Sequence, residues 1–185
     1  MKAKPLIILW CVLVSACSAE FAQKVPHDYS IKEEILDAEQ SSEDFTSNVW
    51  RGAKTFLAIS EDGNPVGMEM AIDVWNEFVP GLFREDGEIV IRFFIASQSE
   101  IVEVLKIQGK YKEGILYDGA SDLVEAECHI YILNGLERAE SLYAHEIGHC
   151  AGFKHSSNPD SIMAAQAGNY FTKEMIEFAQ QNYWR

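Results

Sequence analysis

The pattern of apolar and polar residues divides the chain into a mostly polar first part and an ordered run of strands and helices from about residue 50 onward. Residues 54–60 are expected to form a strand because Phe, Leu and Ile are frequent there. Helical spacing then predicts a helix that starts at the capping pair Asn64-Pro65 and stops at Pro80-Gly81. The apolar residues at this spacing, which we expect in the core, are Met68, Ile72, Trp75 and Val79.

Four apolar stretches follow in the middle of the chain. Residues 89–95 and 127–133 are rich in β-branched and aromatic residues and predict strands. The run at 102–107 is too short for its pattern to distinguish a helix from a strand. Residues 114–117 are expected to form a short edge strand.

Helical spacing returns twice in the last third of the chain. The first helix is expected at 138–151, with an apolar side that packs on the sheet. The residues on this side are Tyr143, Ile147, Cys150 and Ala151. The second helix is expected to start at Thr172, a good capping residue, and to bury Met175, Ile176 and Ala179.

The most specific motif of the chain is the run HEIGHCAGFKH at residues 145–155, which starts within the helix expected at 138–151. Its first two histidines, His145 and His149, lie four residues apart and therefore on one face of a helix. Gly152 is expected to end the helix, because glycine tolerates the left-handed conformation, and the chain can then bring in His155. A catalytic zinc takes three protein ligands and leaves a fourth position for water. Glu146 is placed to reach that water as a general base.

A chance match on an ordinary amphipathic helix is the alternative, because every short motif carries a false-positive risk. The extended form requires a third histidine, and the whole chain has only 5. We therefore expect His145, His149 and His155 to hold one Zn²⁺ ion.

The residues after the third histidine extend the motif into a resemblance to a known family. A His-Glu-x-x-His-x-x-Gly-x-x-His run followed closely by Met163 resembles the metzincin zinc peptidases. Ser156 directly after His155, together with Pro159, makes the chain most similar to the matrixins, the matrix-metalloproteinase group. The resemblance implies zinc-dependent cleavage of peptide bonds, with Met163 as a hydrophobic floor under the metal. Taken alone, Met163 could equally be core filling, since methionine fits irregular gaps.

Some positions depart from the matrixin pattern. Ala164-Ala165 stand where matrixins usually carry a stretch with Tyr and Pro that builds the wall of the specificity pocket. No tyrosine ligand is expected after Met163, and no Pro-Arg-Cys-Gly segment of a cysteine-switch prodomain is present. Outside the motif only His27 and His129 remain, too few for the second zinc of matrixins, and His129 is expected to be structural. The many carboxylates are of the type that binds calcium, although no motif supports a calcium site.

The order of the predicted elements is similar to the metzincin plan over residues 48–185. The resemblance implies an α+β fold in which a twisted mixed β-sheet packs on two helices, with a C-terminal helix after the methionine turn. The length of 185 residues suits one catalytic domain, and we expect a monomer.

Residues 1–16 have the pattern of a secretory leader, with two lysines before an apolar run at 6–14 that is too short to span a bilayer. The segment that ends at Cys17 resembles a bacterial lipobox. This resemblance implies lipidation of Cys17 and a membrane-anchored lipoprotein that faces the periplasm or the cell exterior. Ordinary cleavage after Ala19, giving a soluble secreted protein, is the alternative.

Residues 17–47 are acidic and polar, and we expect a tether or a short pro-segment, with a short helix around Ile31 to Glu39. Removal of the leader would change the formal net charge from −14 to about −16. Such a surface repels phosphate backbones, so no nucleic-acid partner is expected. The acidity mainly favours solubility.

Two of the four cysteines, Cys128 and Cys150, belong to the predicted catalytic domain. Exported proteins occupy oxidising surroundings in which disulfides persist. Cys150 lies on the side of its helix that is turned away from the histidines, and this side would face the strand of Cys128. A disulfide between helix and sheet is one interpretation, and two buried free thiols are the other.

The sequence therefore predicts a zinc endopeptidase that cleaves peptide or protein substrates, with the edge strand at 114–117 pairing with the substrate backbone. Two alternative functions would involve metal binding without cleavage of peptide bonds. One is a non-catalytic metzincin-fold lipoprotein for binding or envelope assembly, and the presence of Glu146 counts against it. The other is a zinc-scavenging surface lipoprotein, and the lack of His-rich stretches counts against that.

Overall fold

The structure is a computed structural model of the 185-residue chain. It describes residues 30–32, 35, 55–63, 65–125, 127–166 and 168–183. The predicted leader at 1–16, the predicted lipidation site Cys17 and most of the segment 17–47 lie outside the described residues. The predictions made for those positions therefore stay predictions.

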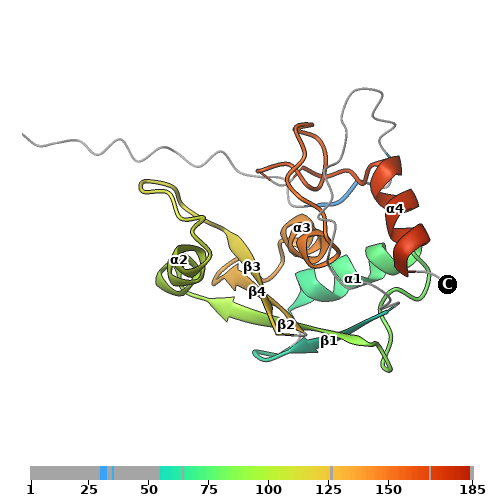
Figure 1. The fold of residues 1–185 in the computed structure, drawn as a ribbon, viewed down its shortest axis with the longest axis horizontal. Coiled ribbons are helices and arrows are strands. Elements are labelled where there is room, and N and C mark those ends of the chain that lie inside the picture. The colour runs from blue at the N-terminus through green and yellow to red at the C-terminus, as the bar shows by residue number, and fades with distance from the viewer. Residues whose placement is uncertain are drawn as a thin grey trace, which may run out of the picture.

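A four-stranded mixed sheet lies along one side of the domain (Figure 1). Its strands, in the spatial order β1-β2-β4-β3, are β1 (Phe56–Ser60), β2 (Ile89–Ala96), β4 (Glu127–Leu133) and β3 (Gly119–Val124). The first three are parallel, and β3 runs antiparallel to β4 at the edge. Parallel neighbours need long crossover connections, and helices supply them here.

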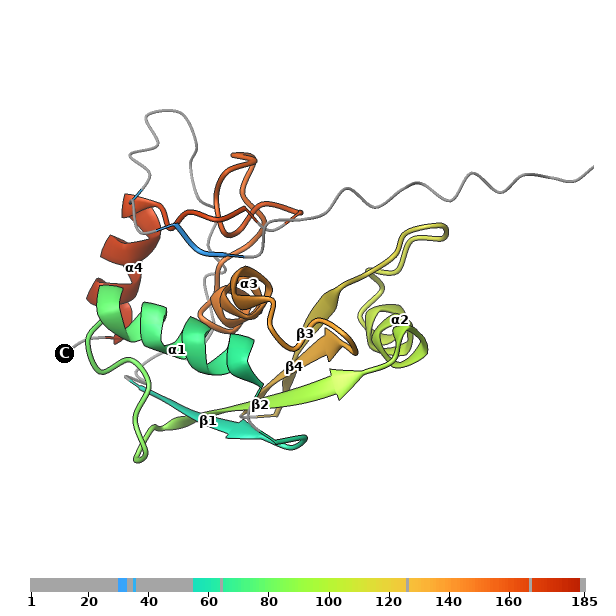
Figure 2. The same cartoon turned by 180° about the vertical axis from the view of Figure 1, so that it is seen from behind.

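Two helices, α1 (Val66–Phe78) and α3 (Glu140–Cys150), cover one face of this sheet (Figures 1 and 2). Side chains alternate along a strand, so every second residue of β2 and β4 joins the core beneath these helices. These residues are Ile89, Ile91, Phe93, Cys128, Ile130 and Ile132. The fully buried Trp75 of α1 donates its indole N–H to the carbonyl of Ala144 at 3.2 Å, which ties α1 to α3.

The helix α2 (Gln98–Ile107) packs a small cluster on the opposite face of the sheet, where Ala96 and Ala120 point. It contains the run 102–107, whose pattern favoured neither helix nor strand. The decisive signal lies just before that run, where Ser97 and Glu100 form a complete capping box.

The edge strand is β3, so the prediction of a strand at 114–117 was wrong. Residues 114–117 lie in the loop between α2 and β3, where Gly114 has a positive φ of 81° and Leu116 is exposed. The apolar residues of that loop suggested a strand. The true strand contains a glycine and an aspartate, and pairing with β4 gives it its conformation.

The last helix, α4 (Lys173–Tyr183), follows Thr172 as predicted, and the Thr172 hydroxyl accepts the N–H of Met175 at 3.3 Å. The sheet, the two helices on one face and this C-terminal helix confirm the predicted α+β arrangement, and α2 is an addition to it. None of the helices in the described part of the chain has the length and apolar character needed to cross a bilayer.

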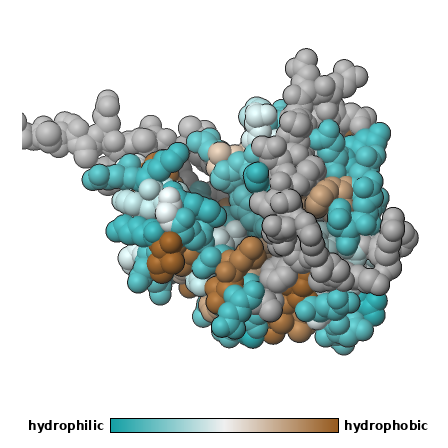
Figure 3. Space-filling view, in the orientation of Figure 1, coloured by the Kyte–Doolittle hydropathy of each residue, from teal (hydrophilic) through white to brown (hydrophobic). Residues whose placement is uncertain are grey.

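Residues 30–32 lie against the domain. Ile31 packs against the main core, and the N–H of Lys32 donates to the carbonyl of Asn169 at 2.7 Å. The helix expected around Ile31 to Glu39 is not formed at residues 31, 32 and 35, the positions of that range that the structure describes. The face drawn in Figure 3 is mostly hydrophilic, in keeping with the net charge of −14, with apolar patches on its lower part.

Candidate metal centre

The helix α3 and the turn after it place the three histidines of the motif. His145 and His149 stand one helical turn apart on α3. The helix ends at Cys150, and Gly152 takes a φ of 96°, a left-handed conformation that favours glycine, as the sequence predicted. The chain reverses there and brings His155 back towards the first two histidines.

The three imidazoles converge. Their candidate ligand nitrogens all lie within 4.8 Å of one another. The ring centroids of His145 and His149 are 4.6 Å apart, and that of His155 lies 5.3 Å from the first and 4.9 Å from the second. Among the described residues, this trio is the group of His, Cys, Asp or Glu side chains with the geometry to hold a metal ion.

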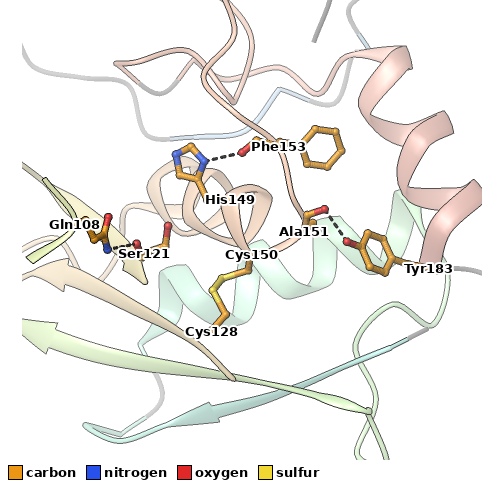
Figure 4. The surroundings of a disulfide bond; sticks show 8 residues. All are labelled: Gln108, Ser121, Cys128, His149, Cys150, Ala151, Phe153 and Tyr183. Carbon is orange, nitrogen blue, oxygen red and sulfur yellow. Dashed lines mark hydrogen bonds between the residues drawn. A yellow bond between two sulfur atoms is a disulfide. The ribbon is translucent and has the colours of Figure 1, made fainter. Parts of the chain in front are cut away.

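Backbone carbonyls orient two of the rings. Nδ1 of His145 donates to the carbonyl of Ile162 at 2.6 Å, and Nδ1 of His149 donates to the carbonyl of Phe153 at 2.8 Å (Figure 4). These bonds leave Nε2 of each ring as the metal-binding nitrogen, the usual arrangement around zinc. The sequence motif gave no sign of these two acceptors, because any residue can supply a backbone carbonyl.

The site favours neutral imidazoles, which are the form that binds metal. Burial lowers the pKa of His145 well below its usual value and lowers the pKa of His149 to about 4. The pKa of His155 is also lowered, mainly by desolvation. The residues present therefore fit a zinc ion in number, orientation and charge state.

Glu146 is buried beside the first histidine, with only 5% of its surface exposed. Desolvation raises the pKa of its carboxyl to about 7. One carboxyl oxygen, Oε2, has no hydrogen-bond partner in the described part of the chain. A carboxyl with a pKa near neutrality can both accept and donate a proton at neutral pH, as a general base and acid must.

Met163 is fully buried and lies directly against α3, which is called the ligand helix below because it carries His145 and His149. A Cβ atom added at Gly148 of α3 would lie 2.3 Å from the sulfur of Met163, so any larger residue there would force the buried Met163 side chain to shift. The turn is fixed by a hydrogen bond of 2.7 Å from the Ser156 N–H to the carbonyl of Met163. The residue before Met163, Ile162, supplies the carbonyl that orients His145.

A disulfide joins Cys128 of β4 to Cys150 at the end of α3 (Figure 4). Its Cα atoms are 5.8 Å apart, and both residues are fully buried in the core. Close by, the hydroxyl of Tyr183 in α4 donates to the carbonyl of Ala151 at 2.7 Å. The end of the ligand helix, next to His149, is therefore held by the sheet and by the last helix.

A cavity of about 460 Å³ adjoins the segment after the third histidine. Its lining includes Ser156, Pro159, Ala164, Ala165 and Tyr170. Ala164 and Ala165 are the positions that depart from the usual matrixin pattern. His129 lies outside the site on β4, 3.2 Å from a carboxylate oxygen of Glu127, and His27 lies outside the described residues.

Two residues near the site were missed by the sequence analysis. The hydroxyl of Ser121 in β3 lies close to Glu146 and acts to lower the pKa of its carboxyl group. The charge of Lys110, in the loop after α2, acts on Glu146 and on two of the histidines, His149 and His155. Neither residue belongs to a motif, and Ser121 could not be placed while the edge strand was assigned to 114–117.

The fold and this site are those of the metzincin class of zinc peptidases. A sequence model of the matrixin family matches residues 58–182. The chain therefore belongs to the matrixin family. A search of curated proteins found no match. The family and the histidine cluster together indicate a zinc metallopeptidase that acts on peptides or proteins.

Proposed function

We propose that this protein is a zinc-dependent endopeptidase in which His145, His149 and His155 hold the metal and Glu146 acts as the general base. One observation carries this proposal. Three imidazoles whose ligand nitrogens lie within 4.8 Å of one another stand next to a buried carboxyl group.

The chain's own groups account for the proton transfers. Zinc, when bound by the three imidazoles, would polarise the scissile carbonyl and make a water molecule more acidic. Glu146 would take the proton of the attacking water and pass it to the leaving amine. Its burial supports this role, because the raised pKa makes the carboxylate of Glu146 a stronger base towards the proton of the attacking water than an ordinary carboxylate.

We propose that extended substrate pairs with the edge strand β3 (Gly119–Val124), which takes the place of the strand expected at 114–117. An edge strand offers backbone N–H and C=O groups to an added strand. A Cβ atom at Gly119 would lie 3.1 Å from Oε1 of Glu146, so substrate paired with this end of β3 would lie close to the general base.

We also propose export, with residues 1–16 as the leader and a lipid on Cys17 as the membrane anchor. The lipobox-like segment supports this, and ordinary cleavage after Ala19 is the alternative. The Cys17→Ser variant should leave the membrane fraction and appear in the soluble fraction. A wild-type protein already soluble would favour cleavage after Ala19.

The catalytic proposal is tested with the full chain and a peptide library. Wild-type protein should cleave peptides, a chelator should stop the reaction, and added zinc should restore it. The Glu146→Gln variant is the matched test, because it keeps the size and the hydrogen-bonding ability of the side chain. It should bind one zinc per chain and lose about 10²–10⁴-fold in rate.

Cleavage at the wild-type rate by the Glu146→Gln variant would contradict the proposed base. Zinc binding by the wild-type protein without any cleavage would instead support the binding or envelope-assembly alternative.

A further inference from the structure

The edge strand β3 turns two residues towards the ligand helix. Gly119 and Ser121 lie directly opposite Ile132 and Ile130 of β4. Both isoleucines are fully buried in the core under α1 and α3. Residues directly opposite each other on antiparallel strands point to the same face of the sheet. Gly119 and Ser121 therefore face α3.

These two positions meet the buried carboxyl group of Glu146 in different ways. At Gly119 a side chain is missing, and an added Cβ would lie 3.1 Å from Oε1. At Ser121, the next position on this face, the hydroxyl faces the same carboxyl group and acts to lower its pKa. The glycine provides space for the carboxyl group, and the serine provides a polar contact in a site that is otherwise desolvated.

Ser121 is itself held from two sides. Its strand pairs with β4 along its whole length. Its backbone carbonyl accepts a hydrogen bond of 2.8 Å from Nε2 of Gln108, at the end of α2 (Figure 4). The hydroxyl thus projects from a fixed backbone, which a positioning contact requires.

We propose, on the basis of the proposed function, that Ser121 is a positioning residue that orients the carboxyl group of Glu146. Its hydroxyl holds the group in one rotamer, so that the unpartnered Oε2 is available for the proton of the attacking water. A hydroxyl can donate to a carboxylate and accept from a carboxylic acid, so the contact survives the proton transfer.

The kinetic test compares Ser121→Ala, Ser121→Thr and Asp122→Asn with the wild type. Removal of a supporting contact at a metal site typically lowers metal affinity or activity 10–100-fold. We expect Ser121→Ala to lower kcat by this factor, with KM and zinc stoichiometry unchanged. Ser121→Thr keeps a hydroxyl in a residue that suits strands and should recover most of the rate. Asp122 opposes His129 on the other face of the same strand, so Asp122→Asn should behave as the wild type.

A second measurement does not depend on turnover. Crystal structures of the wild-type and Ser121→Ala proteins should show the Glu146 carboxyl group reoriented or spread over several rotamers in the variant. An unchanged Glu146 side chain, or an unchanged kcat, would overturn the proposal. A loss of zinc binding in Ser121→Ala would also overturn it, because Ser121 would then act on the whole site.

The two proposals fail in different ways. A wild-type protein that cleaves no peptide would refute the endopeptidase function, while the crystal structures would still decide whether Ser121 orients Glu146.

Discussion

Removal of the disulfide between Cys128 and Cys150 should destabilise the protein by an amount that its position allows us to work out. The crosslinked residues are 22 apart in sequence, and closing a loop of that length restricts the unfolded chain by about 3 kcal/mol at 25 °C. Both residues are fully buried, so the double variant Cys128→Ala/Cys150→Ala also loses packing worth roughly 1–2 kcal/mol. The expected total is about 4–5 kcal/mol.

Urea denaturation of metal-free protein, followed by circular dichroism, measures this difference. The same experiment with a reductant is the control. Reduction breaks the disulfide, so the unfolded wild-type chain is no longer restricted. The difference in the free energy of unfolding between wild type and variant should then fall to the packing contribution of roughly 1–2 kcal/mol. A loss of stability below about 1 kcal/mol without reductant would show that the disulfide does not stabilise the protein in this way. A difference that the reductant leaves unchanged would refute the entropic part of this stabilisation.

Two further predictions concern the ligand helix. Gly148→Ala places a methyl group against the sulfur of the buried Met163, so it should cost about 1–3 kcal/mol in urea denaturation, and unchanged stability would contradict the observed contact. In metal-free protein, the unfolded His149 binds a proton below pH 6.5, whereas the folded residue resists protonation until about pH 4. Stability should therefore be full above pH 6.5 and fall as the pH drops towards 4, by at most about 3 kcal/mol from His149. A His149→Asn variant with the same pH dependence as the wild type would contradict this.

The motif was predictable because its geometry is local. Four residues make slightly more than one helical turn, so His145 and His149 had to share a face once a helix was present. Gly152 marks the point where that helix ends, and its positive φ follows from the need to turn the chain towards His155. The parallel strands β2 and β4 were also predictable, because their sequences are rich in β-branched and aromatic residues.

The rest of the site depends on contacts between distant segments. The strand β3 gains its conformation from pairing with β4, and its own composition gave little sign of it. Ser121 was therefore missed together with its strand. The carbonyls of Ile162 and Phe153 orient two ligands, yet a backbone acceptor leaves no mark in the sequence. The capping box at the start of α2 was a local signal that would have identified that helix.

In the proposed metal centre, three imidazoles hold one zinc ion and leave one position for solvent. This coordination can be measured by X-ray absorption spectroscopy of zinc-loaded protein. We expect three imidazole nitrogens at about 2.0–2.1 Å from the zinc and one oxygen ligand, with two imidazoles remaining in the His155→Ala variant. Two imidazoles in the wild-type protein, or a fourth protein ligand that closes the site, would contradict the proposed zinc coordination.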